Sequence, residues 1–388
     1  MKSNWKEERL GSLVRFSSGG TPNKNNPSYW NGTIPWISAK NMKSEVIETS
    51  DLSITEEGLI HGSKIAPKGS LLLLVRGSGL FNGIPVCYLE NAVAYNQDVK
   101  CIESTSELEN KYLFYWLKAN SGYLRKKIEF TSIGAGKFDT RFLSNLVVRF
   151  PDIVTRKKII DMADNISDRI NINKKINENL LQQAGAVFDK YYNTSSNQQL
   201  FTSLINVLGG GTPKTGNPYF WDGSIPFFTP KDVGAPYTFQ TEKYITESGL
   251  EHCNSRLYPK NTTFVTARGT VGKVSLAGTP MAMNQSCYAL ASKTIDPLLV
   301  YFYALKAVAS LKHKASGAVF DAIVTRDFDT ETINILTDED ARSALSVIAP
   351  AMEAIHNNVE ENMRLSKLRD TLLPNLMSGK LDVSELDL

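Results

Sequence analysis

Two long segments of the chain repeat an apolar or amide-bearing position at alternating steps of three and four residues. The first passes through Ala163, Ile166, Ile170, Asn173, Asn177, Leu180, Ala184 and Val187, and the second through Ile348, Ala351, Ile355, Asn358, Asn362, Leu365, Arg369 and Leu372. This spacing is typical of the stripe along which one long helix packs against another. It predicts helices over about residues 152–191 and 338–373, with Pro374 ending the second because proline has no amide hydrogen to donate.

A helix of this kind would be roughly 60 Å long at 1.5 Å per residue, and it needs a partner for its apolar stripe. We expect the two helices to pair with each other as an antiparallel coiled coil. Asparagines stand at matching positions of both stripes, and they are either polar breaks on surface helices or buried amides that fix the register of the pair. The residues expected along the contact are Ile166, Ile170, Asn173, Asn177, Leu180, Ala351, Ile355, Asn358, Asn362 and Leu365.

The segments outside these helices have a different pattern. Short apolar runs, such as residues 70–75, 85–89 and 262–266, are bounded by glycine and proline, which is typical of strands. A helical pattern follows in each segment, at residues 107–127 and 296–314. Seven or so short strands with one or two helices in each segment predict an α+β fold.

The two segments are copies of one another. Residues 19–42 read GGTPNKNNPSYWNGTIPWISAKNM and residues 210–233 read GGTPKTGNPYFWDGSIPFFTPKDV, and the two align without a gap. Matching elements continue along both copies, which marks an internal repeat. The predicted organisation is a first module at 1–150, a long helix at 151–192, a second module at 193–335, a second long helix at 336–380 and a tail at 381–388.

Composition narrows the class of protein. Lys and Arg total 43 against 40 Asp and Glu, so the formal net charge of +3 neither demands nor excludes a nucleic-acid partner. The four cysteines, Cys87, Cys101, Cys253 and Cys287, lack the spacing of a zinc site and suit a reducing compartment. No apolar leader opens the sequence, and the longest apolar run is too short to span a bilayer. We expect a cytoplasmic protein.

Catalytic motifs are incomplete. The run Asn217-Pro218-Tyr219-Phe220 is similar to the Asn-Pro-Pro-Tyr motif of amino-methyltransferases but lacks its second proline, so a turn is the favoured interpretation. The run at 134–137 is similar to the end of a phosphate-binding loop, but Phe138 replaces the residue that would hold magnesium. His61 and His252 are repeat mates without metal-ligand spacing around them. We therefore expect no catalytic residues, no metal and no bound cofactor.

Polar and basic residues recur at equivalent positions of both copies. Arginine and lysine can bind phosphates and guanine, and amide side chains can pair with adenine. Each residue also has a structural alternative, as a solvated lysine, a structural ion pair or an amide that holds a loop. The candidate DNA contacts are Thr21, Lys40, Arg76, Asn96, Gln97, Arg125, Lys126 and Lys137 in the first module and Thr212, Lys231, Arg268, Asn284, Gln285, Lys312 and Lys314 in the second.

Taken with the ending Leu372-Leu373-Pro374…Ser378-Gly379, the repeated Gly-Gly-Thr-Pro…Asn-Pro…Trp…Ile-Pro elements make the chain resemble the specificity subunit of Type I restriction–modification systems. The resemblance covers almost the whole length. It implies that each module is a target recognition domain for one half of a split duplex DNA sequence, with the helices as the spacer between them.

The resemblance also implies partners. Two modification subunits, which bind S-adenosylmethionine and methylate adenine, would assemble on the chain, and restriction subunits that use ATP would join them. The specificity subunit itself would do no chemistry. Two other classes stay open at this point. They are a coiled-coil scaffold or adaptor whose duplicated modules bind proteins, and a self-contained methyltransferase, which the missing motifs disfavour.

Overall fold

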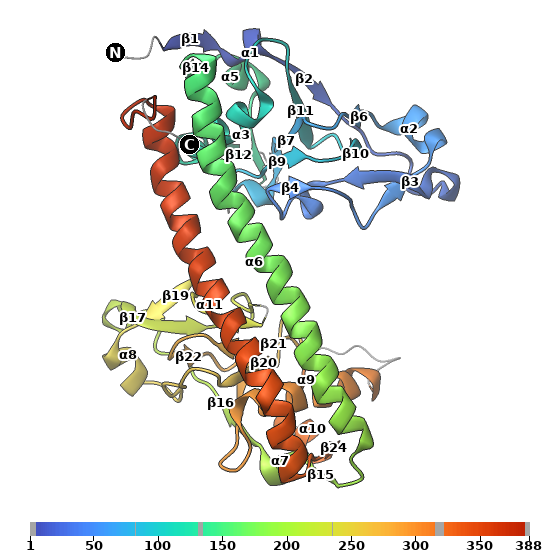
Figure 1. Cartoon of the computed structure of the whole chain (residues 1–388), viewed down its shortest axis with the longest axis vertical. Helices are drawn as coiled ribbons and strands as arrows, with labels where there is room; N and C mark the ends of the chain where they lie inside the picture. Colours follow the sequence, from blue (N-terminus) through green and yellow to red (C-terminus); the bar gives the residue numbers. More distant parts are fainter. Residues whose placement is uncertain (1–4, 82, 131–134, 235, 315–321, 385–388) are drawn as a thin grey trace. The chain divides into compact units, whose positions relative to one another are not determined.

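The computed structural model describes residues 5–81, 83–130, 135–234, 236–314 and 322–384 (Figure 1). The chain divides into two compact units, of which unit 1 comprises Met1–Arg169 with Leu365–Leu388 and unit 2 comprises Ile170–Arg364. The first repeat copy, residues 1–150 (module 1), falls in unit 1, and the second, residues 193–335 (module 2), falls in unit 2. The helices α6 (Ile153–Thr194) and α11 (Asp338–Met377) each contribute residues to both units.

A five-stranded sheet forms the centre of module 1. Its order is β2 (Val14–Ser18), β11 (Val99–Ser104), β7 (Leu71–Leu74), β9 (Val86–Leu89) and β4 (Val46–Ile47). The central strand β7 consists of four leucines, all of them buried, and it pairs antiparallel with both β11 and β9. The runs predicted at 70–75 and 85–89 are therefore strands, and their unbroken apolar character reflects burial on both faces.

Three smaller sheets complete module 1. The first has the order β5 (Ser53–Ile54), β3 (Trp30–Ile37), β10 (Val93–Tyr95) and β6 (Ile65–Ala66). The second has the order β12 (Glu129–Phe130), β13 (Gly136–Lys137) and β8 (Arg76–Gly77), and the third pairs β1 (Lys6–Arg9) with β14 (Val147–Phe150). The helix α2 (Glu56–Gly62) and strand β3 lie on the side of module 1 away from α6 (Figure 1).

Module 1 contains a helical layer as well. Six consecutive residues of α3 (Asn110–Ala119), from Tyr112 to Leu117, are buried. The single helix predicted at 107–127 is wrong, because α3 stops before Asn120 and a separate α4 (Ser121–Arg125) follows. The Asn120 side chain donates to the carbonyl of Trp116 (2.8 Å), which occupies a carbonyl at the end of α3. The other helices of this module are α1 (Leu10–Leu13), η1 (Pro27–Tyr29), η2 (Ala39–Asn41), η3 (Ser78–Phe81) and α5 (Thr140–Ser144).

Module 2 repeats this arrangement. Its five-stranded sheet has the order β16 (Asn206–Gly209), β23 (Cys287–Ala291), β20 (Thr263–Thr266), β21 (Val274–Ala277) and β18 (Tyr237–Thr238), the counterpart of the sheet in module 1. A second sheet has the order β19 (Lys243–Ile245), β17 (Trp221–Phe228) and β22 (Ala282–Met283), and β15 (Gln198–Leu200) pairs with β24 (Thr332–Asn334). The helices are α7 (Phe201–Leu204), η4 (Pro218–Phe220), α8 (Glu247–Glu251), α9 (Pro297–Lys314) and α10 (Thr325–Asp329).

The repeated Trp-Asn/Asp-Gly sequence has one physical explanation in both modules. Asn31 and Asp222 have φ angles of 61° and 58°, the left-handed region that asparagine and aspartate tolerate. A Cβ on Gly32 would lie 2.4 Å from the carbonyl oxygen of Ile54, and a Cβ on Gly223 would lie 2.4 Å from that of Ile245. Only glycine fits these positions, where β3 and β17 change register against their neighbours.

The two long helices pack against each other antiparallel inside unit 2. Asn358 donates to Asn177 (2.8 Å), and Asn173 donates to Asn362 (3.0 Å) and to Glu361 (2.7 Å). Apolar residues of both helices continue the contact within one core, with Ala184 and Phe188 on α6 and Ile348, Met352 and Ile355 on α11. Leu180 and Ala351 are partly buried against that core, while Met352, which the sequence pattern missed, is fully buried.

Inside unit 1, the beginning of α6 packs against the end of α11. Ile159 and Ala163 share one core with Leu373 and Met377. Pro374 does not end α11, contrary to the prediction, because the helix continues to Met377. Proline removes only one hydrogen bond here, and the buried Leu376 and Met377 hold the last turn in place. Gly379 then turns the chain at a φ of 71°, and a Cβ at this position would lie 2.9 Å from the ring of Trp5.

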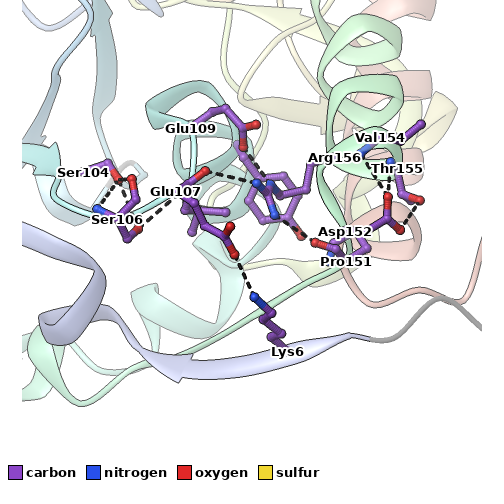
Figure 2. Close-up of polar contacts among 12 residues, drawn as sticks. Lys6, Ser104, Ser106, Glu107, Glu109, Pro151, Asp152, Val154, Thr155 and Arg156 are labelled. Carbon is purple, nitrogen blue, oxygen red and sulfur yellow. Dashed lines mark hydrogen bonds and ion pairs between the residues drawn. The ribbon is translucent and has the colours of Figure 1, made fainter.

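A buried arginine anchors the start of α6 in unit 1 (Figure 2). Arg156 is 2% exposed and donates to Glu109 Oε2 (2.7 Å), the carbonyl of Pro151 (3.0 Å) and the carbonyl of Glu107 (3.0 Å). Asp152 caps the same helix by accepting from the amides of Val154 and Thr155. Hydrogen bonds from the Thr155 and Val154 backbone lower the pKa of Asp152, and its charge also suits a helix N-terminus.

The predicted α+β class, with two tandem modules and antiparallel helix pairing, is confirmed. The estimate of seven or so strands is too low for module 1, where the described residues form the 14 strands β1–β14. Several of these strands have only two residues and leave no periodic signal. Among the described helices, none is both long and apolar enough to cross a membrane.

Candidate nucleic-acid interface

A threonine–glutamine pair recurs at the same place in both modules. Thr21 donates its hydroxyl to Gln97 Oε1 (2.7 Å), and Thr212 makes the same bond to Gln285 Oε1. Both glutamines are exposed. Since each bond uses only the amide oxygen, the Nε2 donors of Gln97 and Gln285 can still serve another acceptor. The structure thus brings these four predicted residues together in equivalent pairs.

The neighbouring asparagines hold turns. Asn96 is buried and its Oδ1 accepts from the amide of Asp98 (3.2 Å), while Asn284 Oδ1 accepts from the amide of Ser286 (3.0 Å). These are side-chain-to-backbone bonds of the type that fixes a turn. The structural alternative named for Asn96 and Asn284 therefore describes their contacts, and the exposed glutamine beside each is the residue free to face a ligand.

Arg76 and Arg268 occupy equivalent exposed positions after the central strands β7 and β20. Their backbone amides donate to the carbonyls of Asp98 (3.2 Å) and Ser286 (3.3 Å), so each arginine sits beside the asparagine turn of its own module. Arg76 also lies opposite Lys137 in the β8–β13 ladder, and Arg268 forms an isolated bridge with Ala322. The repeat thus places an exposed arginine beside the turn that carries an exposed glutamine in both modules.

The remaining predicted cations fall into two groups. Exposed positions hold Lys40 in η2, Lys126 at the end of α4, Arg125, whose guanidinium donates to the carbonyl of Phe81 (2.6 Å), and Lys231, which lies 3.4 Å from Glu242. Two lysines of module 2 make structural contacts instead. Lys312 donates to the carbonyl of Gly272 (2.6 Å), and Lys314 pairs with the buried carboxylate of Glu331 (2.6 Å). Glu331 needs this counter-charge because it is buried.

The motifs that suggested catalysis have structural roles where the structure describes them. Asn26 and Asn217 are the N-caps of η1 and η4, each accepting from the backbone two residues ahead. His61 stacks on Tyr29 and His252 on Phe220, with ring centroids 5.6 and 5.0 Å apart. Gly134 lies outside the described residues. Within the described ranges, no group of three or more His, Cys, Asp or Glu side chains could hold a metal ion.

A groove of about 840 Å³ in unit 1 was not predicted from the sequence. Glu45 forms ion pairs there with Lys118 of α3 and with Arg369 of α11, the second at 2.8 Å. Burial raises the pKa of Glu45, but Lys118 and Arg369 together outweigh it, so the pKa is lowered overall. Burial, with the neighbouring Arg369, lowers the pKa of Lys118. Glu45 and Arg369 are 324 positions apart, and no local pattern could have paired them.

The sequence of the chain matches a family model and several known proteins. A family model described as "Type I restriction modification DNA specificity domain" matches residues 2–182 and 193–344. The MjaIX specificity subunit of Methanocaldococcus jannaschii is 23% identical, over 99% of this chain and 95% of that protein. The HindI specificity subunit of Haemophilus influenzae is 21% identical, over 98% of this chain and all of that protein (100%).

The fold is also similar to a solved structure. The S subunit of a Type I restriction–modification system from M. genitalium superimposes with a TM-score of 0.56 at 14% identity, covering 96% of each chain. Both family matches span one repeat copy each and together cover most of the sequence. The chain belongs to the family of Type I restriction–modification specificity subunits, the subunits that recognise DNA in these systems.

Proposed function

We propose that this chain reads a DNA sequence of two separated parts, with module 1 contacting one half-site and module 2 the other. The proposal rests on one observation: the two modules share the same backbone arrangement but carry different exposed side chains. The Thr–Gln pairs, asparagine caps and exposed arginines are equivalent in the two modules. At other exposed positions the copies differ, as at Ser28 and Tyr219 or at Ile60 and Glu251.

The second part of the proposal concerns the long helices, which would set the distance between the half-sites. Buried amides favour one register of a helix pair over its neighbours, because a shifted pair would leave them without partners. The Asn177–Asn358 and Asn173–Asn362 bonds are of this kind. Two modules joined by a spacer of fixed length also gain effective concentration on one duplex whose half-sites match that length.

The third part concerns partners. Duplicated modules offer similar surfaces twice, which suits the binding of two copies of one partner. We propose that these are two modification subunits that carry S-adenosylmethionine, that restriction subunits using ATP join them in the full complex, and that this chain contributes recognition without catalysis or a cofactor of its own. The structural roles of His61, His252, Asn26 and Asn217 support this division of labour.

The test is to co-express the chain with its modification subunit and sequence the host DNA with a method sensitive to methylated adenine. We expect methylation at a sequence of two short parts separated by a constant number of unspecified base pairs. A single continuous motif would contradict the two-module proposal. Methylation by the modification subunit alone, unchanged when this chain is omitted, would contradict its role in recognition.

The same preparation tests the two other classes. A scaffold or adaptor would assemble with proteins but leave the complex without sequence preference on duplex DNA. A self-contained methyltransferase would bind S-adenosylmethionine as the purified chain, which isothermal titration would detect. Neither class is favoured by the family match over both repeat copies.

A further inference from the structure

The small sheet β12–β13–β8 in module 1 has two rows of facing residues. In one row Lys137 lies opposite both Glu129 and Arg76, and in the other Gly136 lies opposite both Phe130 and Gly77. Facing residues in a ladder point to the same side of a sheet. Charged side chains therefore occupy one side of this sheet, and Phe130 is the single side chain larger than hydrogen in the row on the other side.

Phe130 is unusually prominent for an apolar residue. It is 78% exposed, although its ring stacks on that of Phe81 with centroids 5.3 Å apart and planes 20° apart. The glycines beside it do not cover the ring, and a Cβ on Gly77 would have no atom within 4 Å. Single exposed apolar residues are common and by themselves need no explanation. This one is held on a second aromatic ring and borders open space.

Two exposed cations lie beside the Phe130–Phe81 pair, and two more lie on the other side of its sheet. Arg125 donates to the carbonyl of Phe81 (2.6 Å), and Lys126 follows it at an exposed position. Arg76 and Lys137 face each other directly, an arrangement of like charges that costs stability in a sheet. Glu129 offsets only one of these charges. An apolar ring beside exposed cations is complementary to a polyanion that also offers apolar surface, and duplex DNA has both properties.

We propose that Phe130, supported by Phe81, makes an apolar contact with a base of the half-site read by module 1 and so helps to determine sequence specificity. This inference rests on the proposed function. The ring would touch either the methyl group of a thymine or the face of a base at a locally unstacked step. Arg125 and Lys126 would hold the phosphates beside that base, while Arg76 and Lys137 add positive charge on the other side of the sheet. The inference concerns the half-site of module 1 alone.

The test compares Phe130→Ala with the wild-type chain in the assembled complex with its modification subunit. Binding is measured on a set of duplexes in which each base pair of both half-sites is changed in turn. We expect the variant to lose roughly tenfold in discrimination at one position of the module 1 half-site, with module 2 preferences unchanged. Phe130→Leu should retain part of that preference. Val147→Ala is the matched control, because Val147 is 55% exposed in the same unit but lies on β14.

Two further duplexes identify the apolar contact. Replacing thymine with uracil at the affected position removes only the methyl group, so the wild-type complex should lose affinity and Phe130→Ala should not. Alternatively, 2-aminopurine at that step should become more fluorescent with the wild-type complex than with the variant. Unchanged preference in Phe130→Ala, or a changed preference with no response to either duplex, would overturn the inference. A wild-type complex without any sequence preference would instead overturn the proposed function.

Discussion

Replacing Asn177 with leucine removes the acceptor to which Asn358 donates across the helix pair of unit 2. Asn177 is 8% exposed, so water cannot readily take its place. The donor Asn358 is partly buried, so leaving it without a partner costs toward the lower end of about 1–3 kcal/mol, and the added apolar burial of leucine recovers part of that. We therefore expect Asn177→Leu, and likewise Asn358→Leu, to lower the free energy of unfolding by about 1–2 kcal/mol each.

The double variant Asn177→Leu with Asn358→Leu replaces both partners by apolar groups. Its free energy of unfolding should lie within about 0.5 kcal/mol of the wild-type value or above it, because no amide of this pair remains unpaired. The wild type, the two single variants and the double variant form a double-mutant cycle. Urea unfolding of these four proteins, followed by circular dichroism, gives the coupling energy between Asn177 and Asn358. Asn179→Leu, an exposed position on the same helix, is the control and should show no coupling to Asn358→Leu. Additive losses in the Asn177 and Asn358 cycle would refute the reasoning.

Three further predictions concern individual side chains. Arg156→Met should lower the free energy of unfolding of unit 1 by about 3–5 kcal/mol, because Glu109 loses its buried partner. The control is the exposed Lys157→Met, which should cost less than about 0.5 kcal/mol. A loss for Arg156→Met as small as that of the control would refute the structural role of Arg156. In DNA binding by the assembled complex, Arg76→Ala and Lys137→Ala should each reduce the slope of log affinity against log salt concentration by about 0.9. Lys314→Ala should leave the slope unchanged, because Lys314 pairs with Glu331. Equal slopes for all three variants would contradict this prediction. Because Lys118 and Arg369 hold the pKa of Glu45 below its ordinary 4.5, the stabilisation from Glu45 is complete above that pH and is lost as the pH falls through the lowered value. Glu45→Gln should therefore flatten the acid side of the stability–pH curve, and superimposable curves for the two proteins would contradict the ion pairs.

The features that the sequence predicted well are those with a long or repeated signal. The stripes predicted α6 and α11, helices of 42 and 40 residues, and the repeat places the same turn residues twice. The leucines of β7 form an unbroken apolar run, which identifies a strand that is buried on both faces. In each case many positions agree, so local exceptions do not hide the pattern.

The features that the sequence did not predict depend on only a few residues or on residues far apart in the chain. The strands β8, β12 and β13 have two residues each, too short for any periodicity. Pro374 was expected to end α11, but packing of Leu376 and Met377 outweighs the one missing hydrogen bond.

For the candidate interface, the sequence identified the repeated residues but not their contacts. Asn284 and Gln285 are adjacent amides, yet the first holds a turn and the second is exposed beside Thr212. Lys314 looked like a phosphate contact until the buried Glu331 supplied its partner, 17 positions along the chain. The role of a cation depends on which acid the fold brings near it, and that information is not local.

The measurement that tests the account most directly changes the length of the helix pair. Deleting residues 171–177 from α6 and 358–364 from α11 removes one heptad from each helix, and it removes the facing asparagines together, so none is left unpaired. Seven residues correspond to about 10 Å of helix, or about three base pairs at 3.4 Å each. Methylation-sensitive sequencing should then give the same two half-sites with a spacer about three base pairs shorter. Methylation at the original spacer length would contradict the claim that the helices set the distance between two reading modules.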